Sequence, residues 1–423
     1  MRQELAGAEW YHSAGQPDLF FWREIMASVE YDTLKQEIDE MVPEIVALRR
    51  DLHQHPELAF EEVRTSDIVA GRLRALGLEV QTGIAKTGVV GLLRGTAGEG
   101  GRTLAIRADM DALPIHELNE IDYRSTVDGK MHACGHDGHV SIALAVATLL
   151  SRHRDQLKGA VKFVFQPAEE VIGGASAMVQ AGVMQGVDGV IGLHLFSGHP
   201  VGRVGVRSGP IFAAADRLEL RVKGKGGHAA MPEGAIDPVV AAAQIILALQ
   251  TLISRETSPF ERAVLTIASV HAGSAFNIIP EEALLQGTLR TFDEGYRQRT
   301  IERLREMAQS IAAAHRATCE VEVADGCLAC VNDPAMTEVV QRAAEAAVGS
   351  ERVDSDERVM TTGSDDMAYF LQAVPGCYFI VGARNEEKGA VYPHHHPRFN
   401  IDEEALPVAV EVLARTAFDY LRP

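Results

Sequence analysis

The densest group of potentially reactive side chains is the segment 132–139, which reads His-Ala-Cys-Gly-His-Asp-Gly-His. Cys134 and His136 lie two residues apart on a loop, so their thiolate and imidazole can point to the same side. Such a pair suits a borderline divalent metal: zinc, manganese, cobalt or nickel. The competing interpretation is a polar loop that enters a helix, with Asp137 as the N-cap. The density of ligand-type side chains favours the metal site.

Two adjacent acids, Glu169 and Glu170, directly follow the apolar stretch 160–166. Neighbouring side chains at the end of a strand point in different directions, so one carboxylate can bind metal while the other takes a proton from a bound water. Amide hydrolysis needs this division, because a metal lowers the pKa of water and a carboxylate with a raised pKa carries the proton to the leaving nitrogen. Alone, such a pair is more often a solvated loop.

Further candidates follow other strand-like stretches. Asp109 and Asp111 could bind metal directly or hold a ligand histidine by a hydrogen bond, and a turn or N-cap explains either almost equally well. His194 stands at the predicted exit of strand 189–195, where a lone histidine is more often structural. The triple histidine 394–396 is either a surface tract or supplies one ligand, and chemistry alone does not choose among its members.

The middle and late parts of the chain hold residues suited to a substrate. His228, on a glycine-rich turn, and Asn277 could donate hydrogen bonds to the oxyanion of a tetrahedral intermediate. Arg290 could clamp a substrate carboxylate, and the amides at Gly363 and Ser364 could face an anion while capping a helix. Turns in an ordinary sheet explain the glycines equally well.

The elements that must position these residues form two patterns. Helices alternate with short apolar strands up to residue 195 and again after 334, which predicts an α/β fold, a mostly parallel sheet covered by helices on both faces, with ligands at the carboxyl ends of its strands. Between them lies the order strand, helix, strand, strand, helix, strand, typical of a ferredoxin-like α+β unit. Its predicted elements are 217–225, 238–254, 263–270, 283–291, 296–314 and 319–323.

A chain of 423 residues exceeds a single hydrophobic core of about 250–300 residues. We therefore expect a metal-binding catalytic domain made of 35–212 and 326–423, interrupted by an inserted domain at 213–325. Residues 1–34 show no clear period, apart from the start of an amphipathic helix predicted from Leu34 to about His55, and are interpreted as an extension without an assigned role.

Composition narrows the function classes. The chain is 46% hydrophobic and 23% charged with a net charge of −19, which disfavours a nucleic-acid surface and favours a small ligand. No apolar run reaches about 18 residues and no signal-peptide pattern opens the chain, so we expect a cytoplasmic protein without a membrane partner. Five cysteines predict free thiols, and the pair Cys327 and Cys330 is interpreted as two buried small residues.

From about residue 35 to its end the chain resembles the metallopeptidase family of aminoacylases and carboxypeptidase-like enzymes. Within it, the resemblance is to the branch of hippurate hydrolases, N-acyl-L-amino acid amidohydrolases and auxin-amino acid conjugate hydrolases. The segments that carry it, in order, are LRRDLHQHPELAFEE (48–62), RADMDALP (107–114), MHACGHDGH (131–139), FQPAEE (165–170), GLH (192–194), GGHAAMP (226–232), FNIIP (276–280), GTLRTF (287–292), GSDDMAYF (363–370) and HHPRFNIDE (395–403).

The resemblance implies two divalent ions per subunit, of uncertain identity, held by Cys134, His136, Glu170, His194 and His395, with Glu169 as general base. His395 is chosen because the family's last ligand stands two residues before a proline, here Pro397. Asp111 matches an aspartate that supports a ligand. Asp109 stands where the wider family has a ligand histidine, which leaves its role open.

The activity implied by the resemblance is hydrolysis of acetyl-, benzoyl- or aryl-acyl amino acids by a metal-activated water. His228 would stabilise the oxyanion from a partner subunit, since the family's inserted domain pairs protomers into a homodimer or a dimer of dimers. The rivals are a metallo-dipeptidase, an N-acetyl-diaminopimelate deacetylase and a non-catalytic metal-binding dimer. The free carboxylate of Glu169 disfavours the last of these, because metal storage does not need it.

Overall fold

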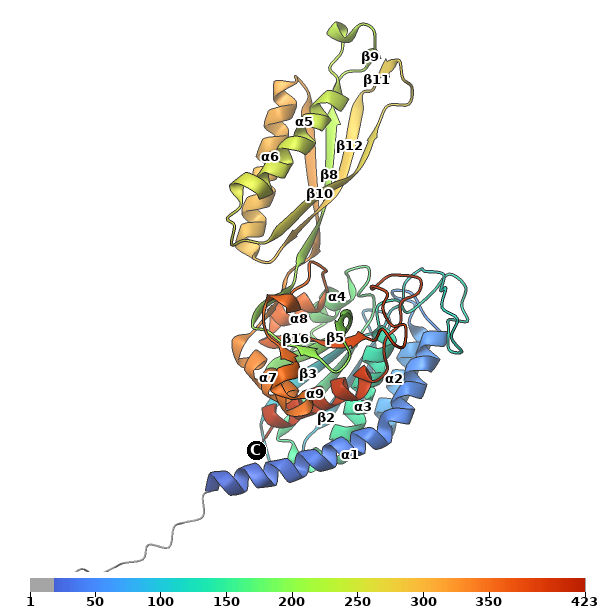
Figure 1. The fold of residues 1–423 in the computed structure, drawn as a ribbon, viewed down its shortest axis with the longest axis vertical. Helices are drawn as coiled ribbons and strands as arrows, with labels where there is room; N and C mark the ends of the chain where they lie inside the picture. The colour runs from blue at the N-terminus through green and yellow to red at the C-terminus, as the bar shows by residue number, and fades with distance from the viewer. Residues whose placement is uncertain (1–18, 423) are drawn as a thin grey trace, which may run out of the picture.

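The computed structural model describes residues 19–422, so the first part of the predicted N-terminal extension lies outside the described residues. Two bodies lie one beyond the other along the long axis (Figure 1). The larger is built from the beginning and the end of the described chain, and the smaller from its middle.

An eight-stranded sheet forms the centre of the larger body, in the order β1-β2-β4-β3-β5-β16-β6-β15. The central strands β4, β3, β5 and β16 run parallel to one another, whereas β1 and β2 join the edge in antiparallel fashion. The expectation of a mostly parallel sheet is confirmed. The strands are β1 (Glu79–Ile84), β2 (Gly88–Arg94), β3 (Arg102–Asp109), β4 (Gly159–Gln166), β5 (Gly189–Pro200), β6 (Val204–Gly205), β15 (Val353–Asp354) and β16 (Gly376–Arg384).

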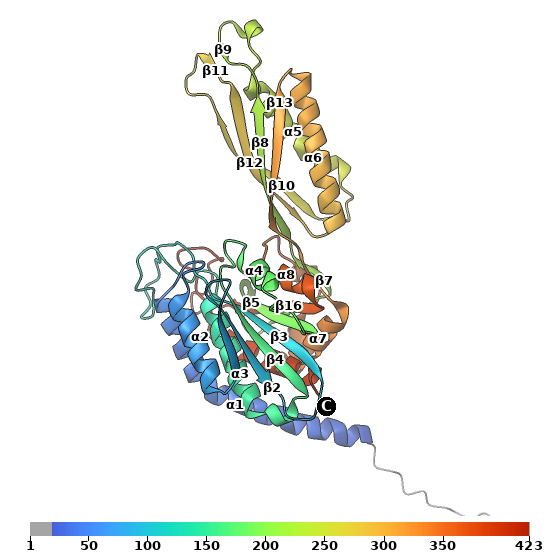
Figure 2. The same cartoon turned by 180° about the vertical axis from the view of Figure 1, so that it is seen from behind.

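Helices cover both faces of this sheet, as the alternating pattern predicts (Figures 1 and 2). The larger of two apolar cores lies under α1 (Leu19–Gln54), α2 (Val63–Ala75), α3 (His136–Arg152), α7 (Pro334–Val348) and α9 (Ala405–Tyr420). The smaller one lies under α4 (Gly174–Gln180) and α8 (Met367–Ala373). The first three turns of α3 are buried on all sides, which places its N-terminus inside the body.

The first helix is longer than its apolar spacing indicates. The predicted helix from Leu34 continues N-terminally to Leu19, so the division at residue 34 falls inside one continuous helix. In the part of α1 whose side-chain burial is described, residues 33–54, the buried apolar residues recur at steps of three and four, as an amphipathic helix requires, and are Leu34, Ile38, Met41, Ile45, Leu48 and Leu52.

A buried ion pair joins α1 to α3. Arg49 and Asp137 are both fully enclosed, and Arg49 Nε lies 2.8 Å from Asp137 Oδ2. His53, one turn further along α1, lies 2.8 Å from the same carboxylate through Nδ1. Arg49 and His53 of segment 48–62 therefore fix the position of α3, the helix whose N-terminus carries His136.

Replacing Arg49 by Met is expected to lower the free energy of unfolding by about 3–5 kcal/mol, because Asp137 would stay buried without its guanidinium partner. Arg50→Met is the matched control. The Arg50 side chain is 46% exposed, and its surface pair with Glu403 is worth about 0–1 kcal/mol. Urea denaturation of both variants at neutral pH measures the difference, and equal losses would contradict a structural role for the buried pair.

The smaller body is inserted between β7 (Gly209–Phe212) and β14 (Cys330–Asn332), two short strands that pair with each other. Its antiparallel sheet has the order β10-β12-β8-β13, with both helices on one face (Figure 2). This is the predicted ferredoxin-like order. Its elements are β8 (Ala214–Lys223), α5 (Pro238–Thr251, continued by a π-helical turn Leu252–Glu256), β10 (Ala263–Ala272), β12 (Glu282–Thr291), α6 (Glu294–Ala314) and β13 (Thr318–Cys327). A two-stranded ribbon of β9 (Gly227–His228) and β11 (Ile278–Ile279) lies at the end remote from the larger body.

Candidate metal centre and active site

The cluster around Cys134 lies where the loop after residue 131 enters α3. Gly135 has a left-handed φ of 94° and is the N-cap, and helix α3 begins at His136. The alternative that Asp137 caps this helix is therefore wrong: Asp137 lies in the first turn and pairs with Arg49 instead. Because only glycine adopts this φ without strain, the turn at Gly135 sets the directions of the residues on either side.

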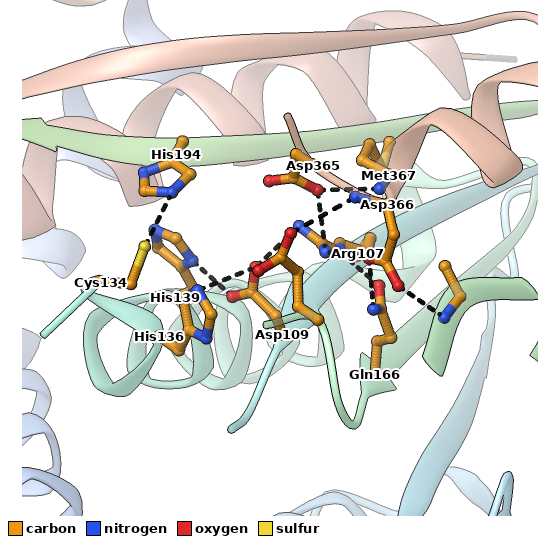
Figure 3. A network of polar contacts seen from close by, with 12 residues as sticks. Arg107, Asp109, Cys134, His136, His139, Gln166, His194, Asp365, Asp366 and Met367 are labelled. Carbon is orange, nitrogen blue, oxygen red and sulfur yellow. Dashed lines mark hydrogen bonds and ion pairs between the residues drawn. The ribbon is translucent and has the colours of Figure 1, made fainter. Parts of the chain in front are cut away.

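Hydrogen bonds fix which nitrogen of two histidines carries the proton. His136 Nδ1 lies 2.8 Å from the carbonyl oxygen of Asp111, and His194 Nδ1 lies 2.8 Å from the carbonyl oxygen of Leu195. A carbonyl only accepts, so both Nδ1 atoms donate and both Nε2 atoms present a lone pair. Ligand atoms of Cys134, His136 and His194 all lie within 4.8 Å of one another (Figure 3).

A second group shares the same sulfur. Cys134, Glu170 and His395 also have ligand atoms within 4.8 Å of one another, and His395 Nε2 lies 3.3 Å from Glu170 Oε2. The backbone of His395 has a left-handed φ of 65°, and its N–H donates to the carbonyl of Ala133 at 2.8 Å. Of the three consecutive histidines, His395 is therefore the one that faces Glu170.

The donor set fits a divalent cation. His136 Nε2 and Glu170 Oε1 are buried, and neither has a hydrogen-bond partner among the described residues. They lie 4.0 Å apart, and each belongs to a group that includes the sulfur of Cys134, so together they form the mixed nitrogen, oxygen and sulfur donor set that suits a divalent cation. Burial, together with the charge of Glu170, raises the pKa of the Cys134 thiol, and a coordinated cation is what would keep a thiolate there at neutral pH.

The two aspartates near β3 hold different parts of the site. The carboxylate of Asp111 accepts the backbone N–H groups of Glu169 and Glu170, each at 3.0 Å. Asp109 Oδ1 lies 2.6 Å from His139 Nδ1, and its Oδ2 lies 3.6 Å from His136 Nε2. Asp111 thus sets the directions of the acid pair, and Asp109 lies against the imidazole of His136.

Glu169 diverges from Glu170, as expected for adjacent residues after a strand. Its side chain is buried, and its Oε1 lies 3.4 Å from the backbone N–H of Asp366. Burial, followed by the charges of Asp365 and Asp366, raises the pKa of the Glu169 carboxyl well above its ordinary value. A carboxyl group with a raised pKa holds a proton more readily than an exposed carboxyl group, which suits it to proton transfer.

One expectation about His194 needs correction. It was placed at the exit of a strand ending at residue 195, but β5 continues to Pro200. The backbone keeps pairing with β16 beyond that point, with Phe196 opposite Gly382 and Pro200 opposite Arg384. His194 therefore projects from within a strand, which holds its ring more firmly than a loop would.

Several residues that connect the site were not singled out from the sequence (Figure 3). His139 Nε2 accepts the N–H of Leu195 at 2.9 Å, so its Nδ1 must donate to Asp109. Arg107 is buried and forms ion pairs with Asp109 at 2.8 Å and with Asp366 at 3.1 Å. Residue spacing is the sequence signal that could have indicated both residues. Arg107 shares a strand face with Asp109, and His139 lies one helical turn after His136.

The residues proposed for substrate binding fall into two separate places. Arg290 Nη1 donates to Ser364 Oγ at 3.2 Å, beside Gly363 and near the acids 365–366. His228 and Asn277 lie instead on the β9–β11 ribbon, at the far end of the inserted body (Figure 1). Within one chain, these two cannot reach Cys134 or Glu169.

The five cysteines are all free and buried, in agreement with the sequence. The thiols of Cys327 and Cys330 both donate to the carbonyl oxygen of Asp365, at 3.0 and 3.2 Å. They are packed donors behind the acidic loop rather than members of a metal cluster, since no ligand group among the described residues includes them.

The thiol of Cys134, the imidazoles of His136, His194 and His395 and the paired carboxylates after β4 gather beside the parallel sheet of an α/β body, an arrangement typical of a metal-dependent hydrolase. Residues 105–419 match the family model Peptidase family M20/M25/M40, and the chain belongs to that family. This confirms the resemblance drawn from the sequence motifs.

Relatives of known name agree with this assignment. The chain is 40% identical over 393 residues to thermostable carboxypeptidase 2 of Saccharolobus solfataricus, covering 92% of this chain and 98% of the relative. It is 41% identical over 374 residues to N-acetylcysteine deacetylase of Bacillus subtilis, covering 88% and 96%. Among solved structures, the Bacillus subtilis YXEP protein, a dinuclear metal-binding peptidase from the M20 family, superposes with a TM-score of 0.80 at 37% identity, covering 90% of this chain and 99% of that one. The protein is therefore a metal-dependent amidohydrolase of this family.

Proposed function

We propose that the protein cleaves the amide bond of N-acyl amino acids, giving a carboxylic acid and a free amino acid. The observation that carries the proposal is the difference between the two acids: Glu170 joins a ligand group with Cys134 and His395, whereas Glu169 is in neither group that includes Cys134, lies close to Asp365 and Asp366 as well as to His136 and Glu170, and has a raised pKa. Such a pair supplies one carboxylate for metal and one for proton transfer.

Two ions would be held by the two groups that share Cys134: one with His136 and His194, the other with Glu170 and His395. The dinuclear relative supports this number. When bound, the ions would lower the pKa of a water and polarise the acyl carbonyl. Asp109 and Asp111 support the ligands. The backbone carbonyl oxygen of Asp111 accepts a hydrogen bond from His136 Nδ1, and the carboxylate of Asp109 accepts one from His139 Nδ1.

Glu169 is the proposed general base and then acid. It would take the proton from the attacking water and deliver it to the amide nitrogen as the C–N bond breaks. The raised pKa allows the protonated form to persist for the second step. Arg290 and the amides at Gly363 and Ser364 would receive the substrate carboxylate, since the guanidinium and Ser364 already lie within hydrogen-bond distance of each other.

His228 and Asn277 are proposed to act in the site of a partner subunit. His228 is exposed at the remote end of the inserted body, beside Asn277 and far from Arg290, Gly363 and Ser364 of the same chain. Their donors would stabilise the oxyanion of the tetrahedral intermediate. A homodimer, or a dimer of dimers, would then be required for catalysis.

The inserted body offers a surface for such pairing. Strand β10 is an edge of its sheet, and edges with unpaired backbone groups readily add another strand.

Helix α5 with its π-helical turn offers a second surface. Within the described residues, Pro238–Glu256 is the one helical stretch long and apolar enough to cross a membrane by length and composition. It packs one face on its own sheet and leaves Val239, Val240 and Leu247 exposed, at 44%, 47% and 71%. Covering these side chains in a dimer favours association.

Two relatives of similar identity have names that favour different substrate classes. The name of the deacetylase relative favours an acylated substrate, whereas the name of the carboxypeptidase relative is compatible with the rival activity of a metallo-dipeptidase. An N-acetyl-diaminopimelate deacetylase is a third variant of the same chemistry. The five free thiols favour a reducing compartment, so we place the enzyme in the cytoplasm, acting on small molecules and on neither nucleic acid nor membrane.

The substrate class is tested with a panel of acetyl, benzoyl and indole-acetyl amino acids against dipeptides and N-acetyl-diaminopimelate. We expect kcat/KM for the best N-acyl amino acid to exceed that for any dipeptide at least about tenfold, since a single mismatched group costs about 1–3 kcal/mol in the transition state. A dipeptide with a free amino group as the best substrate would overturn the proposed class.

Removing metal with a chelator should abolish hydrolysis and lower the melting temperature, because the ions bind the folded state only. Adding back manganese, zinc, cobalt or nickel separately, with elemental analysis, would show which ion restores activity and whether two are bound per chain. A metal-stripped protein of unchanged activity and stability would contradict the metal assignment.

A further inference from the structure

His394 lies against the metal-type cluster but has no part in the ligand groups described above. Its ring is enclosed by three aromatic rings, with centroid distances of 4.9 Å to His194, 5.2 Å to Phe196 and 4.9 Å to Phe399. The next residue is tied to Ala133 through its backbone N–H. Packing and backbone together therefore fix this ring beside Cys134.

The contacts of its two nitrogens determine where its proton lies. His394 Nε2 lies 3.2 Å from the backbone nitrogen of Ser197. A backbone N–H can only donate, so Nε2 must accept, and in a neutral imidazole the proton is then on Nδ1. His394 Nδ1 lies 3.8 Å from Cys134 Sγ, within the range of a contact to sulfur.

We infer that His394 is a positioning residue that donates an N–H···S hydrogen bond from Nδ1 to the thiolate of Cys134. The inference rests on the proposed function, in which Cys134 is a metal ligand. A donor directed at the sulfur withdraws charge from it and fixes its direction, and hydrogen bonds of this kind tune the affinity and electronic properties of a metal site. Because the two ligand groups share Cys134, one hydrogen bond would act on both ions.

The same geometry argues against His394 as a ligand itself. Coordination through Nδ1 would place the proton on Nε2, opposite the N–H of Ser197 at 3.2 Å. Two donors would then face each other without an acceptor, which costs about 1–3 kcal/mol for each unsatisfied buried group. The role of His394 is therefore to hold and polarise the sulfur.

Two substitutions separate the functions of the two nitrogens. In His394→Asn the side-chain amide lies near the former Nδ1 and can still donate to Cys134. In His394→Gln the longer side chain carries its amide near the former Nε2, where it can accept from Ser197 but offers no donor to the sulfur. Both replacements are neutral and polar, so each serves as the matched control for the other.

The test uses the full-length protein loaded with cobalt(II), because the charge-transfer absorption from thiolate to cobalt reports on the sulfur directly. We expect the band to move to longer wavelength in His394→Gln, since the sulfur electrons lose a stabilising donor, and to stay at the wild-type position in His394→Asn. Cobalt affinity should fall about tenfold in the Gln variant and recover in the Asn variant.

An unmoved band in the Gln variant, or equal shifts in both variants, would overturn the inference. So would the loss of one bound cobalt per chain in both variants, which would make His394 a ligand. Cys134→Ser separates this from the proposed function. If the band persists without the thiol, the assignment of Cys134 as a ligand fails; if it disappears there but does not move in His394→Gln, only the role of His394 fails.

Discussion

Glu169→Gln is expected to lower kcat on N-acyl amino acids about 10²- to 10⁴-fold while the protein keeps its full complement of bound metal. The amide of Gln has the size of the carboxyl group but cannot take a proton from water. Glu169 is buried, lies beside Asp365 and Asp366 on one side and His136 and Glu170 on the other, and is absent from both groups that include Cys134. The change should therefore remove proton transfer and leave the ligands in place.

The neighbouring residue supplies the control. Glu170→Gln alters the group shared with Cys134 and His395, and we expect this variant to lose metal as well as activity, because an amide oxygen is a weaker ligand than a carboxylate. Elemental analysis and steady-state rates on both variants distinguish the two roles. Activity that survives in Glu169→Gln would exclude Glu169 as the base, and metal loss in that variant would reassign it as a ligand.

His228→Ala is expected to lower kcat about 10²- to 10³-fold, the usual cost of one lost donor to an oxyanion. The decisive result comes from mixing this variant with Glu169→Gln after both have been dissociated and allowed to reassociate. About half of the dimers formed at random contain one chain of each kind, and each of these has one site with both residues intact. The mixture should regain about one quarter of the wild-type activity.

His315→Ala, which removes another imidazole from the inserted body, should keep wild-type activity and gain nothing on mixing, since His315 only ends helix α6. A mixture of the two inactive variants that stays inactive, although sedimentation shows mixed dimers, would exclude a shared site. His228 would then need another explanation for its place on the remote ribbon.

Much of the fold follows from local pattern. The βαββαβ order of the inserted body and the alternation of helix and strand around it depend on periodicity within short segments, which a sequence displays directly. The full lengths of α1 and β5 could not be predicted from the sequence pattern. Strand β5 passes His194 because its backbone continues to pair with β16, a partner nearly two hundred residues away, and such pairing leaves no mark in the sequence around His194.

In the candidate site, too, some features follow from local sequence pattern and others depend on contacts between distant parts of the chain. That Glu169 and Glu170 point in different directions follows from the alternation of side chains along an extended chain, and their contacts differ accordingly. The assignment of a role to each of the two acids came only from the family resemblance. Residue chemistry alone does not choose among the three histidines, and the family resemblance points to His395 only through its spacing from Pro397. The physical reason is visible only in the structure, where the left-handed backbone at His395 and its hydrogen bond to the carbonyl of Ala133 turn this side chain toward Glu170. The sequence does not reveal the role of Arg107, because a buried arginine is recognisable only once its carboxylate partners have been assembled around it.

The remote position of the β9–β11 ribbon has a consequence for how the enzyme behaves on dilution. If each site is completed by another copy of the chain, association is a step of catalysis and obeys mass action. Specific activity would then fall once the protein is diluted below its dissociation constant, with the rate approaching a second-order dependence on enzyme concentration. Expression level would in that case set the efficiency of each molecule as well as the number of molecules.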